Sequence, residues 1–325
     1  YRCSIEWAKI EFKDGEWDMD AVDHYRQEFQ ALRAAGMTIV LTLHHFTLPL
    51  WVAKKGGWAN REVASRFVRF AEFSFGAFHE FVEYWVTINE PLIYAAKSYL
   101  QGEWPPQKHN FFLFLKVLRN QIWAHKVIFQ RFHARDVYCQ VGIAKNNQFF
   151  TAFHIASKMD RVVASVVGFL WNRWFLNKLG QKFDFIGLNY YFLNRVHFPF
   201  TSVIKDGFVS DIGWSIYPQG IEKVLLDLAR YNRPILITEN GVADRDDHLR
   251  KEFIRGHLYY IHRAIQKGAN VKGYFHWSLF DNFEWSEGFS PRFGLYEVDY
   301  NTFERKRRPS ALYYAQICEN NGLEV

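Results

Sequence analysis

The sequence predicts an α/β fold in which parallel strands alternate with helices and close into a (β/α)8 barrel. Three observations support this prediction. Short β-rich runs alternate with amphipathic helical segments along the chain, and strict alternation of this kind builds a parallel sheet. The glycine-rich phosphate turns typical of an open nucleotide-binding sheet are not found in the sequence. Polar residues instead follow the ends of many strands, and in a barrel those ends converge on one face.

Seven strand–helix units are expected in chain order. Each strand is a short run rich in β-branched, aliphatic or aromatic residues, and the strands are predicted at residues 2–7, 38–44, 84–88, 140–145, 183–188, 235–238 and 271–277. Each helix carries apolar residues at helical spacing, and the helices are predicted at residues 18–36, 61–78, 111–132, 158–179, 219–231, 249–267 and 311–320. The first of these helices shows the signals well, with Val22, Tyr25 and Phe29 on one face and Gly36 as its stop.

The chain is expected to form one barrel domain over residues 1–325, since no linker or low-complexity segment divides it. The seven strand–helix units, together with one more unit at the start, would make the eight units of a (β/α)8 barrel. Because Tyr1 already lies in a strand-like run, we expect that the first strand–helix unit of the barrel is missing from the given chain.

Composition excludes several classes of protein. Hydrophobic residues make up 49% and charged residues 23% of the 325 residues, which is typical of a globular protein. No run of about 20 apolar residues predicts a membrane span. The net charge of +6 comes from scattered residues, and the densest run, residues 305–308, is expected to be a solvated face. Nucleic acid is therefore not an expected partner.

The three cysteines, Cys3, Cys139 and Cys318, are odd in number and not clustered. This pattern argues against a disulfide framework and against a zinc site. A reducing compartment fits it best, so a cytoplasmic location is expected. No metal or organic cofactor is expected.

Two carboxylates follow buried strands. Glu90 comes after Trp85-Val86-Thr87-Ile88, and Glu239 comes after Ile235-Leu236-Ile237-Thr238; each has an asparagine beside it. An ionised group at such a position is costly unless something uses or pairs it. A structural ion pair, or an acid that stabilises a helix N-terminus, is the alternative for either residue alone. On a barrel the two acids would face each other across the mouth.

Paired carboxylates across a pocket fit glycoside hydrolysis, in which one acid donates a proton and the other attacks or supports the anomeric carbon. Phosphoryl transfer would need a phosphate loop, which the sequence lacks. A metal hydrolase would need a ligand cluster, and only His44-His45 comes close. Adjacent strand residues point to opposite faces, so these two imidazoles do not easily bind one ion.

The chain resembles glycoside hydrolase family 1, the β-glucosidase-type TIM barrels. Five motifs carry the resemblance and span nearly the whole chain: TINEP at 87–91, ITENG at 237–241, WSLFDNFEWSEGF at 277–289, DFIGLNYY at 184–191 and YRCSIEW at 1–7. The first motif alone is moderately specific. The second and third in this order are very specific.

The resemblance implies a role for each matching residue. Glu90 resembles the general acid/base and Glu239 the nucleophile of a retaining β-glycosidase, and Arg2 and Tyr191 match groups beside the nucleophile. Retention predicts carboxyl groups about 5–5.5 Å apart. The remaining positions match sugar-binding residues: His45, Asn89, Asn189, Trp277, Glu284, Trp285 and Phe293.

The expected substrates are small-molecule β-glycosides or oligosaccharides with a neutral hexose such as glucose, galactose or fucose. A 6-phosphate would be repelled by Glu284. The chain departs from the family in three places. The opening strand–helix unit, which in the family supplies a sugar-binding glutamine, is absent from the given chain. The stretch between Asn147 and Asp184 is short for the family, and Phe46 stands where the family commonly has tryptophan. A non-catalytic glycan- or partner-binding barrel is the alternative function, and transglycosylation stays open beside hydrolysis.

Overall fold

The computed structural model describes residues 1–198, 201–202 and 208–323. Within it the chain forms two compact units. The first consists of Tyr1–Asn146 and Phe175–Gly187, and the second of Asn147–Trp174 and Leu188–Val325. A single domain over residues 1–325 stays a prediction.

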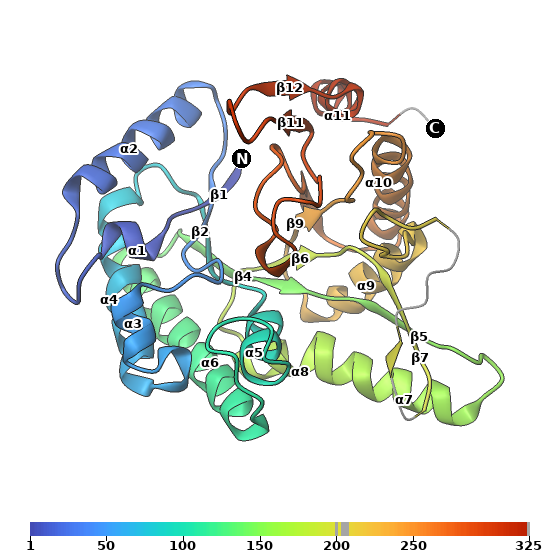
Figure 1. The fold of residues 1–325 in the computed structure, drawn as a ribbon, viewed down its shortest axis with the longest axis horizontal. Coiled ribbons are helices and arrows are strands. Elements are labelled where there is room, and N and C mark those ends of the chain that lie inside the picture. The colour runs from blue at the N-terminus through green and yellow to red at the C-terminus, as the bar shows by residue number, and fades with distance from the viewer. Residues whose placement is uncertain (199–200, 203–207, 324–325) are drawn as a thin grey trace. The chain divides into compact units, whose positions relative to one another are not determined.

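The first unit contains a parallel sheet in which the strand order follows the chain (Figure 1). Its strands are β1 (Arg2–Ser4), β2 (Val40–Thr42), β3 (Tyr84–Asn89) and β4 (Gln140–Asn146), followed by the first residues of β6 (Phe185–Asn189). Parallel neighbours require a crossover between them, and helices supply it. The carboxyl ends of these strands therefore all lie at the same edge of this sheet.

The helices of the first unit begin at side chains that cap them. The crossovers contain α1 (Trp7–Ile10), α2 (Met19–Ala34), α3 (Leu50–Lys54), η1 (Gly57–Ala59), α4 (Arg61–Phe78), α5 (Pro91–Tyr99) and α6 (Phe111–Arg135). Asp18, Asn60 and Asn110 each accept a hydrogen bond from a backbone N–H of the first turn of α2, α4 and α6. Such caps satisfy donors that have no partner inside the helix.

Aromatic side chains fill the core between the sheet and the helices of this unit. The rings of Trp7 and Phe70 stack with centroids 5.3 Å apart, and Phe75 packs against both Trp85 and Phe132. All five side chains are buried. Much of the high aromatic content of the chain therefore serves packing here.

The second unit contains the last residues of β6, then β9 (Ile235–Asn240) and β10 (Val271–His276), again parallel. Its helices are α7 (Lys158–Gly168), α9 (Pro218–Leu228), η3 (Ala229–Tyr231), α10 (Arg250–Gln266), η4 (Trp285–Glu287) and α11 (Pro309–Asn320). A small separate sheet consists of β5 (Phe149–Ala152), β7 (Leu193–Val196) and β8 (Thr201–Ser202). A hairpin joins β11 (Tyr296–Val298) to β12 (Arg305–Arg307).

The structure confirms all seven predicted strands as parallel strands, and every predicted helical segment contains a helix. Some boundaries were wrong. The first strand ends at Ser4, because the carboxylate of Glu6 accepts a hydrogen bond from Ala8 N and starts α1 at Trp7. The predicted helix at 158–179 is α7, a π-helical turn η2 (Phe169–Arg173) and α8 (Trp174–Leu179).

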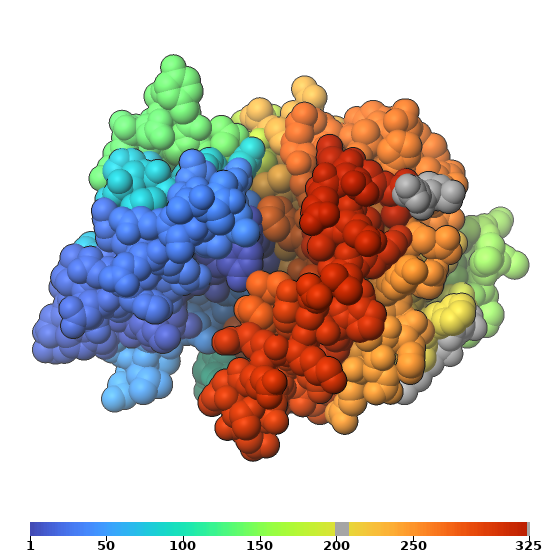
Figure 2. Space-filling view, turned by 90° about the horizontal axis from the view of Figure 1, so that it is seen from above, coloured from blue at the N-terminus to red at the C-terminus, as the bar shows by residue number. Residues whose placement is uncertain are grey.

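The basic run near the C-terminus is only partly a solvated face. The three residues of β12 are exposed, on the C-terminal segment coloured red at the surface in Figure 2. Arg308, by contrast, is buried and paired with Asp281, because its guanidinium turns toward an acid that sequence spacing does not reveal. None of the described helices combines the length and apolar composition that crossing a bilayer requires.

Candidate active site

Glu90 lies at the carboxyl end of β3, where the chain turns into α5. Its backbone is left-handed, with φ of +44°, and Pro91 begins the helix directly after it. Proline suits the first helical position because it has no N–H to leave unpaired. The N–H of Glu90 donates to the carbonyl of Ala144 at 2.8 Å, and the side chain is buried. The turn therefore fixes a carboxyl group at the strand edge.

Three other predicted residues of the first unit surround this strand end. The Arg2 guanidinium donates to Oδ1 of Asn89 at 2.8 Å, so β1 holds the amide next to Glu90. His45 follows β2, and burial together with the charge of Arg2 lowers the pKa of its imidazole to about 3. His45 is thus neutral at working pH and offers one donor and one acceptor to a ligand. Phe46, at the position where the family commonly has tryptophan, packs against Trp104.

The end of β4 contributes two residues that the sequence did not single out. Nδ2 of Asn146 donates to Oε1 of Glu90 at 3.2 Å. Lys145 is buried, and its burial lowers the pKa of its amine to about 7, while the charge of Glu90 acts in the opposite direction. The signal that could have found both is their place in the sequence, because Lys145 is the last residue of the predicted strand at 140–145 and Asn146 follows it directly.

Glu239 lies near the end of β9 in the second unit and is buried. The hydroxyl of Tyr191 donates to its Oε2 at 2.6 Å, and its carbonyl accepts from the N–H of Tyr190 at 3.0 Å. Asn189 ends the neighbouring strand β6, and its Oδ1 accepts from Thr238 at 2.6 Å. Tyr191 and Asn189 therefore lie beside Glu239 at one strand edge.

The remaining predicted residues lie on the segment after β10. Nε1 of Trp277 donates to Oε1 of Glu284 at 3.0 Å, and Phe293 is buried against the Tyr191 ring. Trp277 packs against the same cluster. Burial raises the pKa of the Glu284 carboxyl to about 7; the indole donor lowers it and the charge of Glu239 raises it further. Trp285 has a left-handed φ of +52° and begins η4.

A buried ion pair fixes that segment. Both terminal nitrogens of Arg308 donate to Asp281, each at 3.0 Å. Asp281 also accepts from the N–H of Gly294 at 2.9 Å and lies 3.3 Å from Arg292. Charged, two-point hydrogen bonds of this kind restrict geometry as well as adding energy. The pair therefore holds both ends of the stretch that carries Glu284 and Trp285.

Gly241 explains why the motif after Glu239 ends in glycine. A Cβ at this position would lie 1.8 Å from the carbonyl oxygen of Trp277. Only a residue without a side chain allows the backbone after β9 to approach Trp277 this closely. This close approach places the end of β9 beside Trp277.

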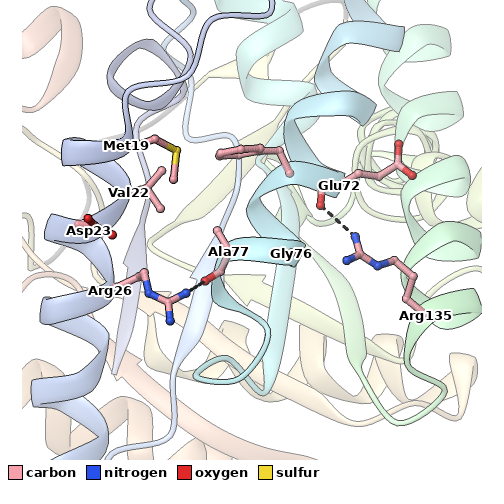
Figure 3. Close-up of a pocket in the computed structure, with 9 residues that line it drawn as sticks. Met19, Val22, Asp23, Arg26, Glu72, Gly76, Ala77 and Arg135 are labelled. Atoms are coloured by element: carbon pink, nitrogen blue, oxygen red, sulfur yellow. Dashed lines mark hydrogen bonds between the residues drawn. The ribbon is translucent and has the colours of Figure 1, made fainter.

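A groove of about 450 Å³ lies elsewhere, on the helix layer of the first unit. Figure 3 shows Met19 and Val22 of α2 facing α4, with Arg26 donating to the carbonyl of Ala77 and Arg135 to that of Glu72. None of the predicted site residues lines it. Within the described residues, no group of three or more His, Cys, Asp or Glu side chains is arranged to hold a metal ion.

Buried carboxylates and amides at the ends of parallel strands are the groups with which barrel enzymes of the glycosidase class act on sugars. The family model for Glycosyl hydrolase family 1 matches residues 1–179 and 175–323. Beta-glucosidase A of Thermotoga maritima is 32% identical over all of this chain and 83% of its own length. A beta-galactosidase of Saccharolobus solfataricus is 32% identical over 94% of this chain and 71% of its own.

Solved structures agree with these relatives. A beta-glycosidase from Pyrococcus horikoshii has a TM-score of 0.94 at 37% identity, covering all of this chain and 81% of its own. A Thermotoga maritima beta-glucosidase solved with glucoimidazole has a TM-score of 0.91 at 31% identity, covering 100% and 83%. The chain therefore belongs to glycosyl hydrolase family 1 and is a retaining β-glycosidase of the (β/α)8 barrel class. Membership of this family favours a catalytic function over the alternative of a non-catalytic glycan- or partner-binding barrel.

Proposed function

We propose that this enzyme hydrolyses terminal β-D-glucosides, and also β-galactosides and β-fucosides, by double displacement. The observation that supports this proposal most is that Glu90 and Glu239 have different surroundings. Each is buried near the end of a parallel strand, and each accepts a hydrogen bond from a different kind of neutral donor, the Tyr191 hydroxyl for Glu239 and the Asn146 amide for Glu90. Two carboxyl groups with different surroundings can take different roles in one reaction.

In the first step the Glu239 carboxylate attacks the anomeric carbon while Glu90 donates its proton to the departing oxygen. The bond to the aglycone breaks, and a covalent glycosyl–enzyme ester forms. In the second step Glu90, now ionised, takes a proton from water, and the hydroxide attacks the anomeric carbon. The ester breaks, and the sugar leaves with its original configuration. The separation of about 5–5.5 Å that retention requires stays a prediction.

The donor to each acid suits its role. The Tyr191 phenol donates to the Glu239 carboxyl at 2.6 Å and so orients the nucleophile. The Asn146 amide donates to the Glu90 carboxyl at 3.2 Å and so orients the acid/base.

Glycone recognition is assigned to Glu284, Trp277 and Trp285 with His45, Asn89, Asn189 and Phe293. The Trp277–Glu284 hydrogen bond aligns a carboxylate with an aromatic face, which suits a neutral ring with hydroxyls on its edge and apolar C–H groups on its face. The relatives named beta-glucosidase and beta-galactosidase support glucose and galactose as glycones. A 6-phosphate next to Glu284 would be repelled.

The test is release of 4-nitrophenol from its β-glucoside, β-galactoside and β-fucoside. Glu239→Gln should lower kcat by orders of magnitude on all three, since the nucleophile is lost. Glu90→Gln should reduce hydrolysis of alkyl glucosides far more than that of 2,4-dinitrophenyl glucoside, because a good leaving group needs little protonation. The control is Glu297→Gln on β11, an exposed carboxylate. Equal losses in Glu90→Gln on both substrates, or full activity in Glu239→Gln, would refute the roles.

A further inference from the structure

Asn240 lies directly after Glu239 at the end of β9 and is fully buried. Its side-chain amide uses both of its polar atoms. Nδ2 donates to the carbonyl of Tyr190, which follows β6, at 2.6 Å, and Oδ1 accepts from the hydroxyl of Tyr274 on β10 at 2.9 Å. The two contacts fix which way the amide faces, because its nitrogen must donate to the carbonyl and its oxygen then accepts from the hydroxyl. Asn240 therefore connects three neighbouring strands.

Glu239 and Asn240 together hold both polar groups of the Tyr190 backbone. The N–H of Tyr190 donates to the carbonyl of Glu239 at 3.0 Å, and its carbonyl accepts from the Asn240 amide at 2.6 Å. That carbonyl belongs to the peptide unit that leads into Tyr191, and because a peptide unit is planar, its position fixes where the Tyr191 backbone begins. The Tyr191 hydroxyl in turn donates to Oε2 of Glu239 at 2.6 Å. A series of bonded groups therefore connects the Asn240 amide to the Glu239 carboxyl.

The Asn240 side chain lies on the opposite face of the sheet from that of Glu239, since successive side chains of a strand point to opposite faces. Its partner Tyr274 packs against Tyr314 of α11, with ring centroids 5.9 Å apart, and the Tyr274 carbonyl accepts from the Tyr314 hydroxyl at 3.1 Å. A helix thus covers this face, and the Asn240 amide points away from a sugar bound at Glu239. Any effect of Asn240 on the reaction must therefore act through other residues.

We propose that Asn240, held by Tyr274, is a positioning residue for the nucleophile. Its amide fixes the peptide between Tyr190 and Tyr191, so that the Tyr191 phenol keeps the Glu239 carboxylate oriented toward the anomeric carbon. The inference rests on the nucleophile role proposed for Glu239. Asn240 neither gives nor takes a proton in either step of the reaction. Its contribution is orientation, to which rates are sensitive, because a displacement of about 1 Å can cost about 100-fold.

The first test is a double-mutant cycle on the hydrolysis of 4-nitrophenyl β-glucoside. Tyr274→Phe removes the hydroxyl that holds the Asn240 amide, and it should lower kcat by about 3- to 10-fold with little change in KM. The same substitution made in Tyr191→Phe should change kcat by less than about 1.5-fold, because the phenol that transmits the effect is already absent. Tyr259→Phe, at an exposed tyrosine of α10, is the matched control and should leave kcat unchanged in both backgrounds. Equal fold losses for Tyr274→Phe in the two backgrounds, or a wild-type kcat in Tyr274→Phe, would overturn the proposal.

A second variant, Asn240→Ala, removes both hydrogen bonds of the amide and should lower kcat by about 10-fold, again with a much smaller loss in the Tyr191→Phe background. In every sample the folded enzyme is counted by the burst of 2,4-dinitrophenol from its 2-deoxy-2-fluoro-β-glucoside, whose glycosyl–enzyme ester hydrolyses slowly, so unfolding alone does not imitate a lower kcat. Failure of the underlying function looks different: the wild type would give no burst, and Glu239→Gln would keep full activity. If the wild type gives the burst while the losses in the cycle simply add, the nucleophile stands and only the role of Asn240 fails.

Discussion

Replacing Arg308 with methionine should destabilise the second unit and weaken glycone binding together. The Arg308 guanidinium makes two hydrogen bonds of 3.0 Å to Asp281 and one of 2.7 Å to the carbonyl of Gly294. Both side chains are buried. Methionine fills similar space, but it leaves an acid in the interior without its main counter-charge.

The magnitude follows from these contacts. Removing one partner of a buried pair costs about 3–5 kcal/mol. Asp281 keeps Arg292 at 3.3 Å and backbone donors, so the lower end, about 3 kcal/mol, is expected. With an unfolding entropy of about 2.1 cal/mol/K per residue, cooperative unfolding of all 325 residues would lower Tm by about 4 °C. Unfolding of the second unit alone, about half of the chain, would lower Tm by about twice as much.

Calorimetry and Michaelis–Menten kinetics on the same samples test this. Lys306→Met removes an exposed basic residue of β12 two positions away and should change stability by no more than about 0.5 kcal/mol. Arg308→Met should also raise KM for 4-nitrophenyl β-glucoside, because the segment from Trp277 to Phe293 loses its anchor. The same Tm for Arg308→Met and Lys306→Met would refute the reasoning.

Three further outcomes are expected. Tyr191→Phe should lower kcat by about 10- to 100-fold, because a hydrogen bond to a charged group contributes about 1.5–3 kcal/mol; steady-state kinetics measures it. Since the pKa of Glu284 is raised to about 7, the ionised fraction of its carboxyl group rises from about one tenth to nine tenths between about pH 6 and 8. KM for β-glucosides should therefore fall over that range, and Glu284→Gln should remove this dependence. Gly241→Ala should lower Tm and activity together, because its Cβ would lie 1.8 Å from the Trp277 carbonyl; calorimetry and turnover measure both.

The elements that the sequence predicted well are those with strong local signals. The helix at 61–78 has the predicted bounds because Asn60 caps it and apolar residues recur at helical spacing until Phe78. The strands at 84–88 and 235–238 are runs of buried aliphatic and aromatic residues, and each extends only slightly beyond the prediction. Periodicity and caps are properties of neighbouring residues, so one sequence suffices to find them.

Elements that depend on distant partners were missed. The strands β5 and β7 are four residues each and pair with one another across about 40 residues of chain, so neither is distinctive alone. The helix α5 is short, and its start after Glu90 depends on a left-handed backbone that the sequence shows only as Pro91. Whether these elements form depends on contacts with residues that are distant in the sequence.

The candidate site shows the same division between local and distant information. Motifs located Glu90, Glu239 and Tyr191 because their residue types and spacing are specific. They did not locate Asn146, Lys145 or the partner of Arg308, since a polar residue at a strand end or in a basic run predicts exposure on average. What distinguishes Arg308 and Asn146 is a contact with a residue 27 and 56 positions away, respectively, and what distinguishes Lys145 is its burial. Contacts and burial of this kind are set by the fold, so the sequence around each residue does not show them.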